Sequence, residues 1–116
     1  VIDLHTQLSN FKRMKTLLKK EIGEAEAKTL VSRAVYMTSI GGNDYAAPYT
    51  ANSSLFQSYS PEEYVDMVIG NLTTVIKGIH KEGGRKFAFL NMAPLGCIPL
   101  FTAINAGDAW RKLQHW

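Results

Sequence analysis

Apolar side chains in the first third of the chain recur with the period of an α-helix. From Leu4 to Ile22 they stand three or four residues apart, a spacing that predicts an amphipathic helix, and Gly23 suits its C-terminal cap. Residues 24–33 predict a second, shorter helix. The nearly uncharged run 34–40 contains β-branched side chains and is followed by two glycines, which predicts a buried strand.

The second half of the chain changes from loop to helix to strand. Residues 46–60 are rich in Ala, Pro, Ser, Asn and Tyr, and they predict an irregular loop. Ser60 and Glu63 then form a capping-box pattern with Pro61 at the first helical position, which predicts the start of a long helix. Its apolar stripe continues to a glycine pair and comprises Tyr64, Val68, Leu72, Val75 and Ile79. Residues 86–92 predict the next strand.

A strand, a crossover helix and a second strand define a βαβ unit, in which the two strands are parallel. Two parallel strands leave both faces of the sheet and both of its edges uncovered. We therefore expect the 116 residues to be a portion of an α/β domain.

Composition excludes several classes of protein. Apolar residues make up 46% of the chain and charged residues 20%, which is ordinary globular usage and argues against disorder, collagen and coiled coil. No apolar run reaches the length of about 18 residues that a membrane-spanning helix needs. The single cysteine excludes a zinc ribbon, a CxxC redox pair and an internal disulfide. We expect neither a metal nor a cofactor.

The net charge of +3 is a mild basic excess. The densest basic group lies in the first predicted helix, wraps most of its polar surface, and has no aromatic residues interleaved with it (Lys12, Arg13, Lys15, Lys19 and Lys20). This pattern is typical of a solvated helix face, so we expect no nucleic-acid partner. The chain starts at Val1 with neither an initiator Met nor a signal-peptide pattern, and we expect it to begin inside a longer product.

Candidate chemistry follows the first predicted strand, because ligand sites in open α/β sheets gather at the carboxyl ends of the strands. Gly41 and Gly42 permit a tight turn and a close approach of substrate to the backbone. Asn43 then offers an uncharged amide donor of the kind that an oxyanion hole uses. The same residues also suit a plain turn, in which Asn43 and Asp44 bond their own backbone.

The segment after the second strand contains the only cysteine, Cys97. A catalytic cysteine needs a lowered pKa and a histidine partner, and none of His5, His80 and His115 is placed to serve. A buried thiol, or half of a disulfide to a segment outside this chain, fits better. The chain also lacks GxSxG, GxGxxG, GxxxxGK, HExxH and Gly-Asp-Ser, so it shows no nucleophile paired with a base.

Two segments together resemble a known family. Gly41-Gly42-Asn43-Asp44 is similar to the Gly-x-Asn-Asp block of the plant GDSL esterase/lipase family, which belongs to the SGNH-hydrolase superfamily, and 94–99 (Pro-Leu-Gly-Cys-Ile-Pro) is similar to its Pro-Leu-Gly-Cys-x-Pro segment. Their order and separation match the middle of such a protein. Within the family, the chain most resembles the myrosinase-associated and epithiospecifier-modifier-like branch.

The resemblance implies a three-layer, flavodoxin-like α/β/α fold with a parallel sheet, a Ser-Asp-His triad, and hydrolysis of a carboxylic ester or lipid. It also implies that Asn43 belongs to the oxyanion hole, together with a serine-block N–H and a glycine of another block. On this reading, residues 1–116 are the central part of one hydrolase domain, without the N-terminal nucleophile block and the C-terminal Asp-x-x-His block.

Two glycosylation sequons begin at Asn52 and Asn71. Asn52 falls in the predicted loop and is the better candidate for a glycan. Both sequons suit a secreted plant glycoprotein, extracellular or vacuolar, which is what the family resemblance also implies.

Three hypotheses about function remain open at this point. The first is a segment of an ester hydrolase that supplies Asn43 and is inactive alone, while the serine and histidine come from other segments of the enzyme or from companion chains of a nicked enzyme. The second is a catalytically silent binding protein with a myrosinase-type partner. The third is a βαβ fragment that binds a mononucleotide, against which the lack of a phosphate-cradling glycine pattern counts.

Overall fold

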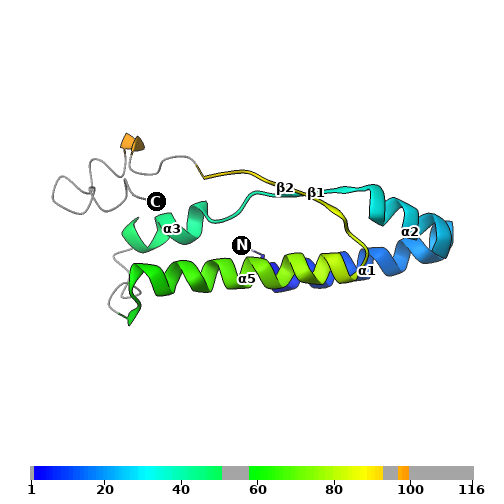
Figure 1. Ribbon diagram of the computed structural model, residues 1–116, viewed down its shortest axis with the longest axis horizontal. Coiled ribbons are helices and arrows are strands. Elements are labelled where there is room, and N and C mark those ends of the chain that lie inside the picture. Colours follow the sequence, from blue (N-terminus) through cyan, green and yellow to red (C-terminus); the bar gives the residue numbers. More distant parts are fainter. Residues whose placement is uncertain (1, 51–57, 93–96, 100–116) are drawn as a thin grey trace. The chain divides into compact units, whose positions relative to one another are not determined.

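The computed structural model describes residues 2–50, 58–92 and 97–99. Its named helices and strands are shown in Figure 1: α1 (Leu4–Ile22), α2 (Glu24–Arg33), β1 (Val35–Thr38), α3 (Gly42–Thr50), α5 (Pro61–Lys81) and β2 (Lys86–Phe89). They fall into two compact units. The sheet unit comprises the described residues of Val1–Thr38 and Val65–Phe89, and the α3 unit comprises those of Ser39–Tyr64 and Leu90–Trp116.

The first two helices confirm the sequence prediction, and local caps explain their bounds. The Asp3 carboxylate accepts a hydrogen bond from the Thr6 backbone N–H at 2.8 Å, which satisfies one of the donors left free at the start of α1. Gly23 ends α1 with a φ of +85°, a conformation that side chains disfavour, and α2 begins at the next residue.

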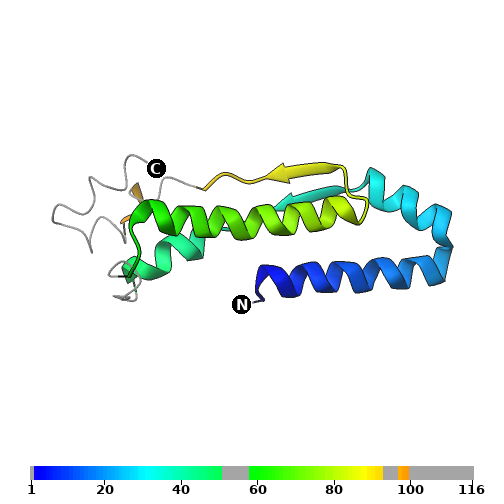
Figure 2. The same ribbon diagram turned by 60° about the horizontal axis from the view of Figure 1, so that its bottom comes forward.

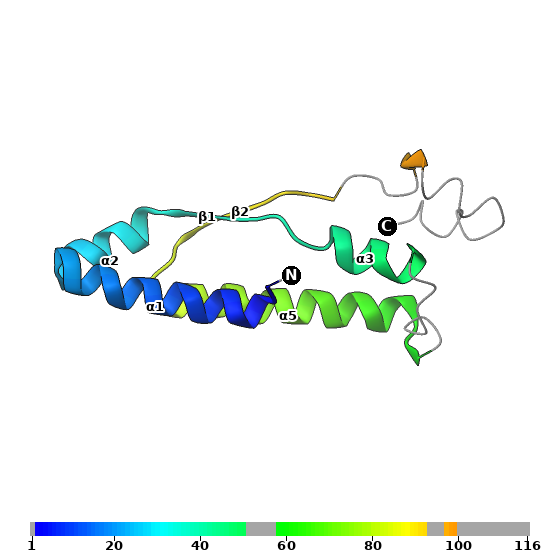
Figure 3. The ribbon, with the colours of Figure 1, turned by 180° about the vertical axis from the view of Figure 1, so that it is seen from behind.

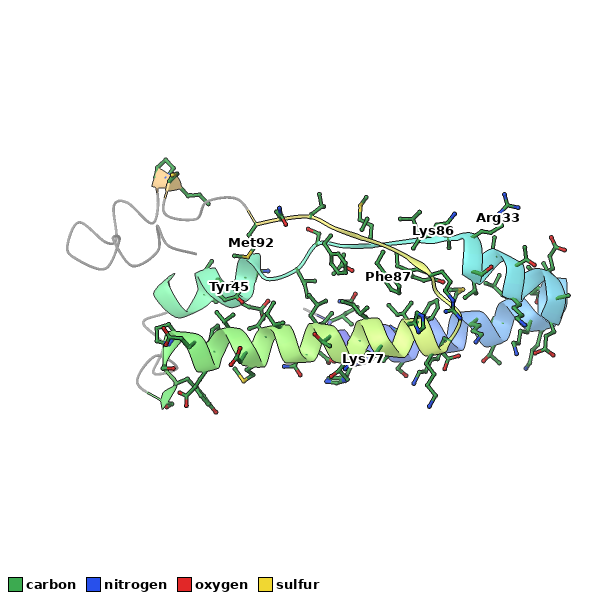
Figure 4. The ribbon with its side chains drawn as sticks, viewed as in Figure 1. Arg33, Tyr45, Lys77, Lys86, Phe87 and Met92 are labelled. Carbon is green, nitrogen blue, oxygen red and sulfur yellow. The ribbon has the colours of Figure 1, made fainter. Side chains whose placement is uncertain are left out.

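The sheet of the sheet unit has two strands, β1 and β2, and they are parallel as predicted, with Tyr36 paired to Phe87. Helices α1 and α5 lie on one face of this sheet (Figures 1 and 2). Phe87 points toward the helices, whereas its neighbour Lys86 points the other way (Figure 4). On the covered face Tyr36 makes an edge-to-face contact with Phe11 of α1, with ring centroids 5.4 Å apart.

Helices α1 and α5 run in the same direction beside each other (Figures 2 and 3), and two contacts fix their alignment. Near the start of α1, Leu8 packs so closely on Gly78 that a β-carbon at Gly78 would lie 2.6 Å from the Leu8 Cδ2. Further along, the Lys15 ammonium donates to the Glu82 carboxylate at 2.7 Å and to the Glu82 carbonyl at 2.6 Å. The second bond satisfies a carbonyl just beyond the end of α5.

The other face of the sheet is open, which corrects the prediction of a buried strand. Val35 is 61% exposed and Met37 is 70% exposed, because none of the described residues covers them. Both strands are also shorter than the predicted runs 34–40 and 86–92. The pairing between β1 and β2 ends at Thr38 and Phe89.

Helix α5 begins with the predicted capping box. The Ser60 hydroxyl accepts from the Glu63 N–H at 3.2 Å, and the Glu63 carboxylate accepts from the Ser60 N–H at 2.8 Å. The helix ends at Lys81, and Gly83 follows with a φ of +113°. On the predicted stripe, Tyr64 is buried within the α3 unit and Val75 is buried within the sheet unit.

The prediction of a loop over 46–60 is wrong for its first residues, because α3 extends from Gly42 to Thr50. The reading of 41–44 as a simple turn is wrong for the same reason. Gly41 turns the chain with a φ of +101°, and its carbonyl then accepts the Tyr45 N–H at 2.9 Å as the first helical bond. Residues 51–57 of the predicted loop lie outside the described residues. Within the described part of the chain, every helix is too short or too polar to cross a membrane.

Candidate functional site

Asn43 lies in the first turn of α3, and its side chain is exposed. The chain reaches this point five residues after β1 ends, through the left-handed Gly41. The first turn of an α-helix presents backbone N–H groups that have no partner inside the helix, and the helix dipole is positive there. An exposed amide at this end of a helix is therefore suited to stabilise a negative oxygen.

Gly41 lies where the segments that follow the two strands pack against each other. It is buried, and a β-carbon at this position would lie 3.0 Å from the Met92 Sδ and 3.5 Å from the Tyr45 Cε2. Met92 follows β2 and Tyr45 belongs to α3, and the two side chains lie near each other in Figure 4. Packing and backbone conformation thus both explain a glycine here. Gly42, in contrast, is exposed, and a β-carbon there would have no atom within 4 Å; contact of either glycine with substrate stays a prediction.

Tyr64, in the first turn of α5, supports the turn that carries Asn43. It is buried, and its hydroxyl donates to the Asp44 backbone carbonyl at 2.7 Å. Its ring meets the Tyr45 ring edge to face, with centroids 6.0 Å apart. Burial raises the pKa of Tyr64 and of Tyr45 above the ordinary tyrosine value, and the Asp44 charge adds to both shifts. The Tyr64 hydroxyl therefore keeps its proton at neutral pH and stays a donor.

Sequence reasoning placed Tyr64 only on the apolar stripe of its helix and gave Tyr45 and Met92 no role. A signal for Tyr64 was nevertheless present. Pro48 stands four residues after Asp44 and has no N–H, so a helix through both residues leaves the Asp44 carbonyl without its usual partner. Either water or a donor from elsewhere in the fold must then satisfy it.

The other residues that the sequence singled out do not join Asn43 in a described site. Cys97 is exposed, which corrects the expectation of a buried thiol, and its pairing in a disulfide stays a prediction. His5 lies in α1 and His80 in the last turn of α5, and His115 lies outside the described residues. Over the ranges that the structure describes, no three His, Cys, Asp or Glu side chains gather as metal ligands would.

The structure describes one of the two predicted sequons. Asn71 is exposed on α5, where its side chain is accessible from solvent. Asn52 lies outside the described residues. Glycosylation of either residue stays a prediction.

The described elements define a partial α/β domain, with a parallel βαβ unit and an exposed asparagine after its first strand. The comparison with protein families agrees with this class. Residues 3–116 match the family described as GDSL-like Lipase/Acylhydrolase, and the chain belongs to that family.

The chain is similar to several plant proteins. GDSL esterase/lipase 1 of Arabidopsis thaliana is 52% identical over 105 residues, which are 90% of this chain and 28% of that protein. GDSL esterase/lipase 2 of the same plant is 54% identical over 105 residues, with the same coverage of 90% and 28%. A GDSL lipase of Tanacetum cinerariifolium is 42% identical over 107 residues, which are 92% of this chain and 27% of that protein. The chain thus spans about a quarter of the length of these relatives, and no solved structure matches it.

Proposed function

We propose that this chain is the central segment of a GDSL-type serine ester hydrolase and that it supplies Asn43 to the oxyanion hole. Membership of the family supports hydrolysis of a carboxylic ester or lipid. The observation that carries the role of Asn43 is its exposed position in the first turn of α3, directly after the left-handed Gly41. The serine nucleophile and its histidine base would come from residues outside these 116.

The proposed chemistry of Asn43 is electrostatic. Attack of the serine oxygen on the ester carbonyl moves an electron pair onto the carbonyl oxygen, and the Asn43 Nδ2 amide donates a hydrogen bond to that oxyanion. Because the amide is neutral, covering it with bound substrate costs less desolvation free energy than covering a charged donor would. Its contribution is larger in the transition state than in the bound substrate, because the negative charge develops only then.

The test is Asn43→Ala in a complete polypeptide that carries this segment together with a serine block and an Asp-x-x-His block. With p-nitrophenyl butyrate as substrate, we expect kcat to fall by about 10²–10³-fold with little change in KM. Asn10→Ala is the matched control, because Asn10 is exposed on α1 and carries no catalytic assignment. An unchanged kcat for Asn43→Ala removes this residue from the hole.

The isolated chain gives a second test. We propose that it does not hydrolyse esters by itself, because it contains no Gly-Asp-Ser sequence. A serine-reactive fluorophosphonate should leave it unlabelled, and labelling of this chain would contradict the proposal. A native mass well above 12.9 kDa, with companion chains that label, would identify a nicked enzyme. A native mass near that value would instead favour a silent binding protein of the myrosinase-associated type.

A further inference from the structure

The helix that carries Asn43 contains a proline at a position that costs it a hydrogen bond. In α3 the carbonyl of residue i normally accepts from the N–H of residue i+4. For Asp44 that partner is Pro48, which has no N–H. The Gly41 carbonyl keeps its bond from the Tyr45 N–H, so the first hydrogen bond of the helix is intact and the missing one is at Asp44.

The Tyr64 hydroxyl takes the place of the missing donor. It reaches the Asp44 carbonyl at 2.7 Å from a residue 20 positions further along the chain. Tyr64 is only 7% exposed, and its ring packs against the Tyr45 ring. This packing of the Tyr64 ring holds its hydroxyl in one place. A hydroxyl held this way costs little conformational entropy to aim.

We propose that Tyr64 is a positioning residue for ester hydrolysis: by bonding the Asp44 carbonyl, it holds the first turn of α3 and so fixes the Asn43 amide toward the oxyanion. The inference rests on the proposed role of Asn43. Tyr64 acts through the backbone of the adjacent residue and does not contact the reacting atoms. Preorganised donors stabilise a transition state because no free energy is spent on aiming them during the reaction.

The test uses Tyr64→Phe in the complete hydrolase that carries this segment. Phenylalanine keeps the buried ring and removes only the donor. We expect kcat for p-nitrophenyl butyrate to fall by about 2- to 10-fold with KM unchanged, the range to which a net hydrogen-bond free energy of about 0.5–1.5 kcal/mol converts. Tyr36→Phe is the matched control, because the Tyr36 hydroxyl donates to the Val31 carbonyl at 2.8 Å in the sheet unit. It should leave kcat at the parent value.

Two further variants separate positioning from a general loss of stability. In an Asn43→Ala background, Tyr64→Phe should have no further effect on kcat, because the group that it positions is gone. Pro48→Ala restores an N–H at residue 48, so α3 supplies its own donor to the Asp44 carbonyl. In the Tyr64→Phe background, Pro48→Ala should return kcat to within about 2-fold of the parent value.

The outcomes distinguish the two proposals. The inference is overturned if Tyr64→Phe behaves like Tyr36→Phe, if its effect multiplies with that of Asn43→Ala, or if Pro48→Ala restores nothing. If Asn43→Ala alone leaves kcat unchanged, the proposed role of Asn43 fails, and the inference that depends on it fails too. A loss in both single variants, with no additional loss in the double variant, supports both.

Discussion

Two glycines of α5 differ in what stands opposite them, and this makes the contact between α1 and α5 testable. A β-carbon at Gly70 would have no atom within 4 Å, whereas one at Gly78 would lie 2.6 Å from Cδ2 and 3.1 Å from Cδ1 of Leu8. Both residues are inside the same helix. The substitutions Gly70→Ala and Gly78→Ala therefore share the gain in helix propensity and differ in the packing cost.

The magnitudes predict different effects of the two substitutions on the free energy of unfolding. Replacing glycine by alanine inside a helix stabilises it by about 1 kcal/mol, so Gly70→Ala should raise the free energy of unfolding by about that amount. Gly78→Ala receives the same gain but forces Leu8 to move, and such overpacking costs about 1–3 kcal/mol. We expect Gly78→Ala to be neutral to destabilising by about 2 kcal/mol, and therefore less stable than Gly70→Ala by about 1–3 kcal/mol.

The assay is urea unfolding of both variants and the parent, followed by circular dichroism in the same polypeptide. A third comparison adds Leu8→Ala, which removes the methyl groups that the new β-carbon meets. In that background the two glycine substitutions should have equal effects. The reasoning is refuted if Gly78→Ala stabilises the parent as much as Gly70→Ala does, because the close approach of Leu8 would then not exist.

Two more predictions concern the ion pair on the sheet unit and its open face. The Lys15 ammonium lowers the pKa of the Glu82 carboxyl, first by its hydrogen bond and then by its charge. The pair therefore stabilises the fold at pH values above the ordinary glutamate pKa of about 4.3. This stabilisation is lost as the pH falls through the lowered pKa of Glu82 in the folded protein. Glu82→Gln should therefore lower the free energy of unfolding by about 1 kcal/mol at pH 7 and by much less at pH 3. Glu24→Gln is the control and should have a smaller effect, because Glu24 is more exposed. Equal losses for Glu82→Gln at both pH values would contradict the stabilising role of the Lys15–Glu82 pair. Met37→Ala should change the stability of this chain by less than about 0.5 kcal/mol, but by about 2–5 kcal/mol in a complete three-layer domain that covers the open face; equal small effects in both would show that the face stays uncovered.

The sequence was most informative where the cause of a structure is local. The capping box of Ser60 and Glu63 forms as predicted because both partners lie within one turn of helix. Gly23 ends α1 because few other residues adopt its left-handed conformation. The parallel pairing of β1 with β2 was also predictable, because a crossover helix of this length permits it.

The candidate site was predictable only in part. Asn43 stood out because it follows a strand and resembles a family block, but the pattern of residues suggested a turn and a loop where α3 forms. Two contacts made by this segment come from residues that are distant in sequence. The Met92 side chain packs against Gly41, and the Tyr64 hydroxyl donates to the Asp44 carbonyl in place of the N–H that Pro48 lacks.

The sequence by itself therefore determined the helices with strong periodicity and the parallel βαβ unit, and it singled out Asn43 as a candidate amide. Only the tertiary structure decided which face of the sheet is covered, how α1 aligns with α5, and which residue supports the turn that carries Asn43. The physical reason is range: caps and periodicity act within a few residues, whereas the donor for the Asp44 carbonyl is 20 residues away and meets it only after the chain has folded.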